Sequence, residues 1–274
     1  MTLNLAAWNE RLVALAADQR VCQLDNRGKV RVVDDERVKI VILESTSGRA
    51  AWCFNGLAEI QGQPMTLWLA RTLHQVEAWR RGPGGIADAV AEEASGLREF
   101  SRLPFVHTFI FVGWHDHRPV VGIIHNGDEP QGRGTPKARF AVELHYEPGG
   151  ALVSGTDEAV SDGDGRALEW LASSYPAGEA LQGRLEALIR KGAASPRAKG
   201  RVGEGSISVF LPVVGTVAIR SSHAGSRATK MEMPVQVGQF GVAGVTLQLG
   251  EPVRFLTPEQ QRHLRRRDRG RGGG

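Results

Sequence analysis

The chain has 274 residues, of which 41% are hydrophobic, so it is long enough to bury a substantial core. It contains no run of about eighteen apolar residues and no basic segment followed by an apolar one at its start, which argues against a membrane span or a secretory signal and favours a cytoplasmic protein. The net charge of +4 comes from the last segment, where residues 262–271 hold six arginines and one aspartate, so the rest of the chain is close to neutral.

The first half of the chain is predicted to form two strand pairs followed by two helices. Short apolar runs separated by polar turns are typical of antiparallel strands, and apolar residues at intervals of three and four are typical of helices. We interpret the polar stretch 23–37, with Asn26-Arg27-Gly28 as its turn signal, as the connection between the two pairs. The predicted strands cover residues 3–8, 12–17, 38–43 and 50–54, and the predicted helices begin at Pro64 and near Ile86.

The second half repeats this order, with strands, then two helices, then strands. Helices gathered in pairs between blocks of strands argue against a parallel βαβ fold and predict an α+β fold with two antiparallel sheets covered by helical layers. We expect one domain over residues 1–256, with a β-rich extension from about residue 212, and a basic, disordered tail over residues 257–274. The predicted strands cover residues 106–112, 120–124, 139–144, 207–211, 213–219 and 235–249, and the predicted helices cover residues 166–174 and 181–189.

Three residues of the predicted strand pairs suggest a nucleophilic site: Thr2, Asp18 and Lys39. Initiator methionine is normally removed when a small residue follows it, which would place the hydroxyl of Thr2 beside a free α-amine. Such an amine is partly neutral at physiological pH and can act as the base for its own hydroxyl. A neighbouring ammonium group lowers the pKa of the amine, and a carboxylate holds that ammonium group in place. Asp18 ends one predicted strand and Lys39 begins another, so both could reach Thr2.

Two motifs in this region resemble those of the proteasome β-subunit family of N-terminal-nucleophile hydrolases, including its bacterial relatives. Ala17-Asp18-Gln19-Arg20 resembles the family's aspartate motif, and Val38-Lys39-Ile40 resembles its lysine motif after an insertion of about five residues. The resemblance implies a four-layer αββα sandwich in which a mature N-terminal Thr2, Asp18 and Lys39 form the active site. We expect Arg20, on the same strand face as Asp18, to pair with the Asp18 carboxylate.

Two further segments extend the resemblance over about residues 1–211. Asn55-Gly56-Leu57-Ala58 resembles the family segment whose glycine N–H is the oxyanion donor, which assigns that role to Gly56. Val153-Ser154-Gly155-Thr156 resembles the family's Ser-Gly element before the third helix, which adds Ser154 to the candidate site residues.

The activity implied by the resemblance is hydrolysis of peptide bonds by a threonine-type mechanism. The substrate would be a peptide or protein, an apolar pocket near Val21, Val41 and Phe54 would accept a hydrophobic residue, and the protein would assemble as a homo-oligomer, in a ring or a related form. The family's aspartate after the fourth helix has no counterpart in residues 195–199, and its following serine is matched only by Ser206. A catalytically inactive scaffold or binding subunit of the same fold is therefore the alternative.

Other residue clusters have simpler explanations. His107, His115, His117 and His125 lie on or near one predicted hairpin without zinc-ligand spacing, so we expect no metal and no cofactor. Asp162-Gly163-Asp164-Gly165 lacks the terminal glutamate of a calcium loop and is interpreted as a turn and helix N-cap. Cys22 and Cys53 are interpreted as small core residues. The segment from Arg262 to Arg271 has no interleaved aromatic residue, which favours a solvated tail over a nucleic-acid contact.

Overall fold

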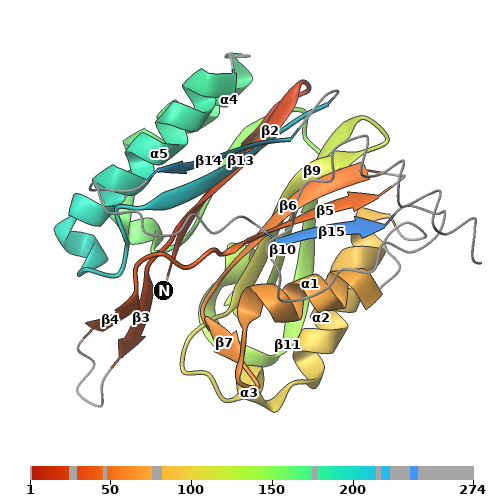
Figure 1. The fold of residues 1–274 in the computed structure, drawn as a ribbon, viewed down its shortest axis with the longest axis vertical. Coiled ribbons are helices and arrows are strands. Elements are labelled where there is room, and N and C mark those ends of the chain that lie inside the picture. Colours follow the sequence, from red (N-terminus) through yellow and green to blue (C-terminus); the bar gives the residue numbers. More distant parts are fainter. Residues whose placement is uncertain are drawn as a thin grey trace, which may run out of the picture.

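The protein is a stack of two β-sheets between two layers of helices (Figure 1). The computed structural model describes residues 2–24, 30–45, 48–75, 82–174, 178–213, 217–222 and 235–239. Within these ranges one pair of helices covers the outer face of one sheet, and a second pair covers the outer face of the other. This four-layer αββα arrangement confirms the predicted fold class.

The first sheet has the strand order β12-β1-β2-β13-β14, with antiparallel pairing throughout. The side chain of Asn9 closes the β1–β2 hairpin, because its Oδ1 accepts the backbone N–H groups of Arg11 and Leu12. The strands are β1 (Leu3–Trp8), β2 (Leu12–Asp18), β12 (Gly150–Gly155), β13 (Ser206–Pro212) and β14 (Ala218–Ser222).

The second sheet has the order β11-β10-β9-β6-β5-β15. Its pairs are antiparallel except that β15 runs parallel to β5. The strands are β5 (Ile40–Ser45), β6 (Gly48–Asn55), β9 (Thr108–His115), β10 (Arg118–Glu129), β11 (Arg133–His145) and β15 (Val235–Gln239).

Each sheet has its own pair of helices. Helices α4 (Asp162–Ser173) and α5 (Gly178–Ala194) pack on the first sheet, and α1 (Met65–Gln75) and α2 (Pro83–Gly96) pack on the second. None of the helices in the described ranges is both long and apolar enough to cross a bilayer. The shorter elements are β3 (Val21–Leu24), β4 (Val30–Asp34), β7 (Glu59–Ile60), β8 (Gln63–Pro64), α3 (Arg98–Ser101), η2 (Pro130–Gly132), η3 (Asp157–Ala159) and η4 (Pro196–Ala198).

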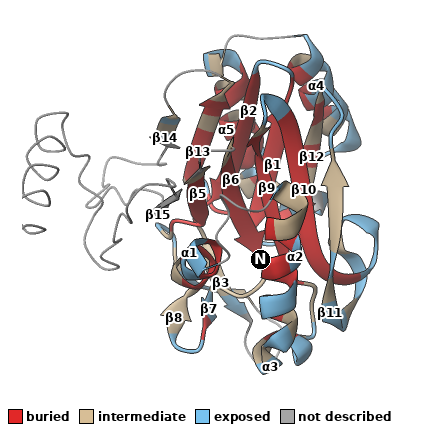
Figure 2. Cartoon of the chain, turned by 90° about the vertical axis from the view of Figure 1, so that its right-hand side faces the viewer, coloured by how far each residue is buried: buried red, intermediate tan, exposed pale blue. Residues whose placement is uncertain are grey.

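Three apolar clusters fill the three interfaces between the four layers. Strand β1 contributes to two of them, because successive side chains point to opposite faces of a strand. Leu3, Leu5 and Ala7 face the α4–α5 layer, whereas Ala6 and Trp8 face the second sheet. The central strands are accordingly buried along their length, while the outer faces of the helices are exposed (Figure 2).

The structure differs from the sequence-based expectations at several places in the first half. Cys53 is buried as expected, but Cys22, interpreted as a core residue, is only partly buried. The pair β7–β8 and the short helix α3 were not predicted. The stretch 23–37, interpreted as a connection, contains part of a separate hairpin, in which β3 pairs with β4. The apolar run of β4 is short and is followed by the charged residues 34–37, so the stretch reads as a polar connection, and in the structure Val32 and Val33 are exposed. Asn26-Arg27-Gly28, the end of the predicted strand 235–249 and the basic tail lie outside the described residues.

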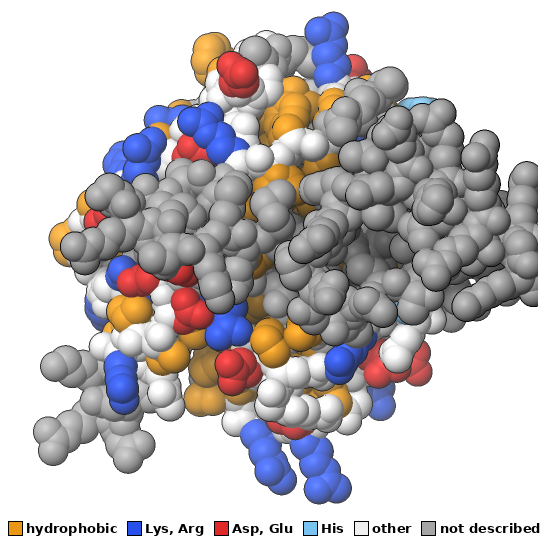
Figure 3. Space-filling model, in the orientation of Figure 1, with side chains coloured by type: hydrophobic (Ala, Val, Ile, Leu, Met, Phe, Trp, Pro, Cys, Tyr) orange, Lys and Arg blue, Asp and Glu red, His pale blue; other side chains and the backbone are white. Residues whose placement is uncertain are grey.

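The charged side chains of the described body are mixed in sign. On the face shown in Figure 3, lysine and arginine lie among aspartate and glutamate. This distribution agrees with the near-neutral composition of the chain before its arginine-rich end.

Candidate active site

Thr2 and Lys39 meet between the two sheets. Thr2 directly precedes β1 of the first sheet, and Lys39 directly precedes β5 of the second. The Lys39 Nζ lies 2.7 Å from the Thr2 Oγ1, and the two residues are 2% and 4% exposed. The facing sheets thus bring a threonine hydroxyl and a lysine ammonium group, 37 residues apart in the chain, into direct contact in a buried position.

Asp18 is the anionic partner of this pair and is fully buried. Its Oδ1 accepts the Leu3 N–H at 2.7 Å and lies 3.5 Å from the Lys39 Nζ. Its Oδ2 accepts the N–H groups of Arg20 at 3.0 Å and Gly203 at 3.1 Å. Three backbone donors therefore hold the carboxylate in one orientation beside the lysine.

Lys39 has three acceptors around its side-chain nitrogen, the number that an ammonium group can serve. They are the Thr2 Oγ1, the Asp18 Oδ1 and the backbone carbonyl oxygen of Arg20. Burial lowers the pKa of Lys39 below its ordinary value, and the charge of Asp18 opposes that change. Of the three acceptors only the Thr2 hydroxyl also carries a proton, so it is the one group that can donate to a neutral Lys39.

The prediction for the Arg20 side chain is wrong. Its guanidinium group pairs with Asp35, with Nε 2.5 Å from Oδ1, and its Nη1 donates to the Gly200 carbonyl oxygen at 3.1 Å. Three backbone N–H groups and the Lys39 ammonium group already use the acceptor sites of Asp18, and the guanidinium group pairs instead with the more exposed carboxylate of Asp35. Arg20 contributes to the site only through its main chain, whose N–H binds Asp18 and whose carbonyl binds Lys39.

Strand β12 holds the main chain of Thr2 from the other side. The carbonyl oxygen of Thr2 accepts the N–H of Thr156 at 2.9 Å. Gly155 has φ +92°, and a Cβ at this position would lie 1.9 Å from the Thr2 carbonyl oxygen and 3.4 Å from the Asn55 Cβ. The absence of a side chain at Gly155 therefore allows Thr2 and the end of β6 to approach each other.

The remaining two candidate residues, Ser154 and Gly56, lie at this junction. The Asn55 Nδ2 donates to the Ser154 Oγ at 3.0 Å, which links β6 of the second sheet to β12 of the first. Gly56 follows Asn55 directly and has φ +108°, a conformation that favours glycine. The sequence motifs thus fall on segments that adjoin Thr2, while the catalytic roles assigned to them stay predictions.

The segment after α5 reaches the site through its main chain. Residues 196–198 form the short helix η4, and the described contacts between this segment and Asp18 come from the N–H of Gly203. Ser206 begins β13 and is the Cα partner of Asp18 in the β2–β13 ladder. Gly203 was not predicted from the sequence, because a backbone donor carries no side-chain signal.

His107 is a further residue near the site whose position the sequence did not predict. It is fully buried, and its Nδ1 accepts the N–H of Leu57, one residue after Gly56, at 3.0 Å. The sequence analysis considered it only as a metal ligand. A single histidine before an apolar strand gives no signal for a contact fifty residues earlier in the chain.

The other histidines and acidic residues considered as ligands lie in different surroundings. His115 lies at the end of β9, and the His125 Nε2 lies 2.8 Å from the Glu143 Oε1. Asp164 lies in the first turn of α4, which Ser161 caps, and its Oδ2 accepts from Lys191 at 2.6 Å. Within the described ranges no group of three or more His, Cys, Asp or Glu side chains is arranged to hold a metal ion.

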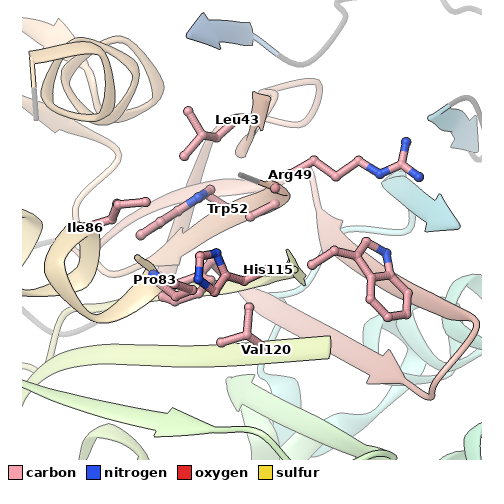
Figure 4. A pocket seen from close by; sticks show the side chains of 11 residues that line it. Leu43, Arg49, Trp52, Pro83, Ile86, His115 and Val120 are labelled. Carbon is pink, nitrogen blue, oxygen red and sulfur yellow. The ribbon is translucent and has the colours of Figure 1, made fainter. Parts of the chain in front are cut away.

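A small pocket lies away from Thr2, at the N-terminal end of α2 (Figure 4). It has a volume of about 30 Å³, which accommodates one or two water molecules. Thr2, Asp18 and Lys39 do not line it, so it is no part of the candidate active site. The labelled side chains that surround it are Leu43, Arg49, Trp52, Pro83, Ile86, His115 and Val120.

Comparison with known proteins adds structural neighbours at low similarity. No protein-family model and no curated protein matches the chain. Among solved structures, the chain is similar to an Anbu (Gly-1) mutant from Hyphomicrobium sp. strain MC1, with 15% identity and a TM-score of 0.49 over 81% of this chain and 86% of that one. It is also similar to Anbu (ancestral beta-subunit) from Yersinia bercovieri, with 11% identity and a TM-score of 0.47 over 77% of this chain and 81% of that one. Both TM-scores lie below 0.5, so the fold description depends on the layers and strand order given above.

Proposed function

We propose that the protein is a threonine-type N-terminal-nucleophile hydrolase that cleaves amide bonds in peptides through Thr2 after Met1 is removed. The observation that supports this function best is the buried contact of 2.7 Å between the Lys39 Nζ and the Thr2 Oγ1, with Asp18 beside the lysine. A buried ammonium group is unfavourable unless it is paired. Its placement on a threonine hydroxyl therefore indicates a site built around that hydroxyl.

In the proposed reaction the Thr2 Oγ attacks the carbonyl carbon of the substrate amide, and the α-amine of Thr2 accepts the hydroxyl proton. The carbonyl oxygen becomes the oxyanion of a tetrahedral intermediate, for which the N–H of Gly56 is the proposed donor. The C–N bond then breaks, the leaving amine takes the proton, and an ester forms on Thr2. Water, deprotonated by the same α-amine, attacks this ester and releases the acid product.

Lys39 acts on both groups of Thr2 in this scheme. Its positive charge lowers the pKa of the nearby amine, which keeps the amine available as a base, and its hydrogen bond to Oγ1 stabilises the developing alkoxide. Asp18 orients Lys39, and three backbone N–H groups orient Asp18 in turn. The backbone N–H groups thus fix Asp18, Asp18 fixes Lys39, and Lys39 binds the Thr2 hydroxyl, which is the arrangement that a preorganised nucleophile needs.

The alternative is an inactive scaffold or binding subunit with the same fold, and one observation favours it. The segment after α5 supports Asp18 through the backbone of Gly203, and its residues 195–199 include no carboxylate that could hold the α-amine of Thr2. Such a protein would retain the buried Lys39–Asp18 pair for stability alone.

Intact-mass analysis and active-site labelling distinguish the two functions. The purified protein should lack Met1, and a peptide β-lactone should add its mass once, at Thr2. Thr2→Ala should abolish this label and Thr2→Ser should retain it. Retained Met1, or a label that persists in Thr2→Ala, would contradict the proposal.

Thr156→Ala is the matched control for these labelling experiments. Thr156 is also a buried threonine, and its backbone N–H binds the carbonyl oxygen of Thr2. Its hydroxyl has no hydrogen-bond partner within the described part of the chain. We expect this variant to label at the wild-type rate, which would show that the reagent does not react with this second buried threonine.

The proposed peptide specificity and assembly depend on the sequence resemblance. A library of fluorogenic peptides with apolar or charged residues before the scissile bond tests the first. Light scattering of the purified protein tests the second, and a monomer at micromolar concentration would contradict the proposed homo-oligomer.

A further inference from the structure

His107 is a buried polar residue that the proposed reaction does not use. It directly precedes β9, and its main chain is held by Asn126: the His107 N–H donates to Asn126 Oδ1 at 2.7 Å, and the Asn126 N–H donates to the His107 carbonyl oxygen at 3.3 Å. Its side chain makes one hydrogen bond among the described residues, in which Nδ1 accepts the N–H of Leu57 at 3.0 Å. The ring is therefore fixed on the segment that follows β6.

This hydrogen bond determines which ring nitrogen carries the proton. Because Nδ1 is an acceptor, the proton of the neutral imidazole lies on Nε2. Nε2 is buried without a hydrogen-bond partner in the described ranges, among the rings of Phe100 and Phe109, whose centroids lie 4.7 Å and 4.6 Å from that of His107. Burial lowers the pKa of His107 to about 3, so the ring is a neutral acceptor at physiological pH.

The same ring also packs directly on Gly56. A Cβ at Gly56 would lie 2.4 Å from the His107 Nδ1, and the φ of +108° is already unfavourable for a side chain. His107 thus limits both the position of the Gly56 Cα and the orientation of the peptide that follows it.

Asn55 fixes the other end of this peptide segment. Its Nδ2 donates to Ser154 on the first sheet, and its Cβ lies next to the space at Gly155 that the Thr2 carbonyl oxygen also borders. The backbone of residues 55–57 is therefore anchored at Asn55 through Ser154 and at Leu57 through His107.

We propose that His107 is a positioning residue that sets the orientation of the Gly56 peptide N–H toward the oxyanion formed when Thr2 attacks a carbonyl group. This inference rests on the proposed function. His107 does not touch the reacting atoms in this role; it acts through Leu57 and Gly56. A donor that is displaced by about 1 Å loses much of its effect on the transition state, so loss of the His107 hydrogen bond slows only reactions that form an oxyanion at this place.

Two electrophiles with different chemistry separate this role from general damage to the fold. A peptide β-lactone acylates Thr2 through a tetrahedral oxyanion, whereas a peptide vinyl sulfone alkylates it by addition to a carbon–carbon double bond, without a carbonyl oxyanion. Both reagents need the same nucleophile. A change in the ratio of their rates in a variant therefore reports on stabilisation of the carbonyl oxyanion, whereas damage to the nucleophile slows both reactions.

The variants are His107→Phe, which keeps an aromatic ring but removes the acceptor, and His107→Asn, whose Oδ1 restores an acceptor near the position of Nδ1. Val112→Ala is the control, since Val112 is buried on β9 and faces the other sheet without touching the Gly56 segment. We expect His107→Phe to reduce the maximal rate of β-lactone acylation about 10- to 100-fold while the vinyl sulfone rate changes less than about threefold. His107→Asn should recover part of the loss, and Val112→Ala should leave the ratio of the two rates unchanged.

NMR spectroscopy tests the hydrogen bond from the Leu57 N–H to the His107 Nδ1 independently of any activity measurement. In ¹⁵N-labelled wild-type protein, the Leu57 amide nitrogen should show a coupling across the hydrogen bond to the His107 Nδ1, and the imidazole shifts should indicate the Nε2–H tautomer. A protonated Nδ1 or the absence of this coupling in folded protein would overturn the inference, as would equal changes in both labelling rates in His107→Phe. If wild-type protein shows the coupling but neither reagent labels Thr2, the proposed function fails and the positioning role of His107 fails with it.

Discussion

Replacing Asp18 by asparagine tests whether the buried carboxylate organises the site. The side chain is fully buried, and its two oxygens accept from the main chain of Leu3, Arg20 and Gly203 and face the Lys39 ammonium group. An asparagine has the same shape but only one acceptor oxygen, with an NH₂ group in place of the other. In either orientation, two of the four donors would face another donor.

The expected loss follows from these contacts. Hydrogen bonds to a charged group contribute roughly 1.5 to 3 kcal/mol each, and removing one partner of a buried ion pair costs about 3 to 5 kcal/mol. We therefore expect Asp18→Asn to lower the free energy of unfolding by about 3 to 5 kcal/mol, a large part of the total for a typical domain. Labelling of Thr2 should be lost as well, because Lys39 no longer has a charged partner.

Two variants provide the comparison. Asp35→Asn removes the carboxylate that pairs with the Arg20 side chain, but Asp35 is 51% exposed, so we expect a loss below about 1 kcal/mol. Lys39→Met removes the buried charge and leaves Asp18 with its three backbone donors. It should therefore destabilise the protein less than Asp18→Asn, although it should abolish labelling to the same extent.

Urea unfolding followed by circular dichroism gives the three free energies, and β-lactone labelling gives the rates. A loss for Asp18→Asn no greater than that for Asp35→Asn would refute the assignment of Asp18 as the organising group. A larger loss for Lys39→Met than for Asp18→Asn would refute the argument that the backbone donors satisfy the carboxylate.

Three further predictions concern Gly155, His107 and Lys39. Gly155→Ala should slow labelling and destabilise the protein by roughly 1 to 2 kcal/mol or more, because φ is +92° and the new Cβ would meet the Thr2 carbonyl oxygen. The control is Gly165→Ala, whose Cβ would meet nothing within 4 Å and which should lower neither the labelling rate nor the melting temperature. In wild-type protein, burial lowers the pKa of His107 to about 3, so between pH 6.5 and about 4 only the unfolded state binds a proton at this residue, and stability falls as pH decreases, by up to about 1.4 kcal/mol per pH unit. His107→Phe should therefore flatten the pH dependence of the unfolding free energy measured in urea. An unchanged slope would contradict the burial of His107 as a neutral ring. Burial lowers the pKa of Lys39 in the folded state, so the unfolded state binds more protons at this residue as pH increases toward 10.5, and the stability of the wild type relative to Lys39→Met should rise. The measurement is the difference between the two urea midpoints. A difference that does not change with pH would show that Lys39 is not desolvated.

Local patterns predicted the order and type of most elements. Apolar runs located β1 and β2 almost to the residue, and helical spacing located α4 and α5, because these patterns record which face of an element is buried. The β3–β4 hairpin was not predicted because its short apolar runs lie among turn and charged residues, and its exposed valines contribute to none of the three apolar clusters.

The motifs also predicted which segments meet around Thr2, but not how each side chain is used. Arg20 illustrates the difference: its motif position is next to Asp18, yet its guanidinium group binds Asp35 because backbone donors already occupy the carboxylate. Gly203 and His107 were not predicted, since one contributes only a backbone N–H and the other is a single histidine beside an apolar strand.

The layers of this protein and its candidate nucleophile could be predicted before the fold was known, because burial periodicity and short motifs are local properties of the chain. The contact of the Thr2 hydroxyl with Lys39, and the hydrogen bonds of Asp18 to the main chain of residues 3, 20 and 203, are visible only in the folded protein. These contacts join segments far apart in the chain, and their distances depend on how the two sheets pack against each other. No local pattern records that packing, which is why it required the folded structure.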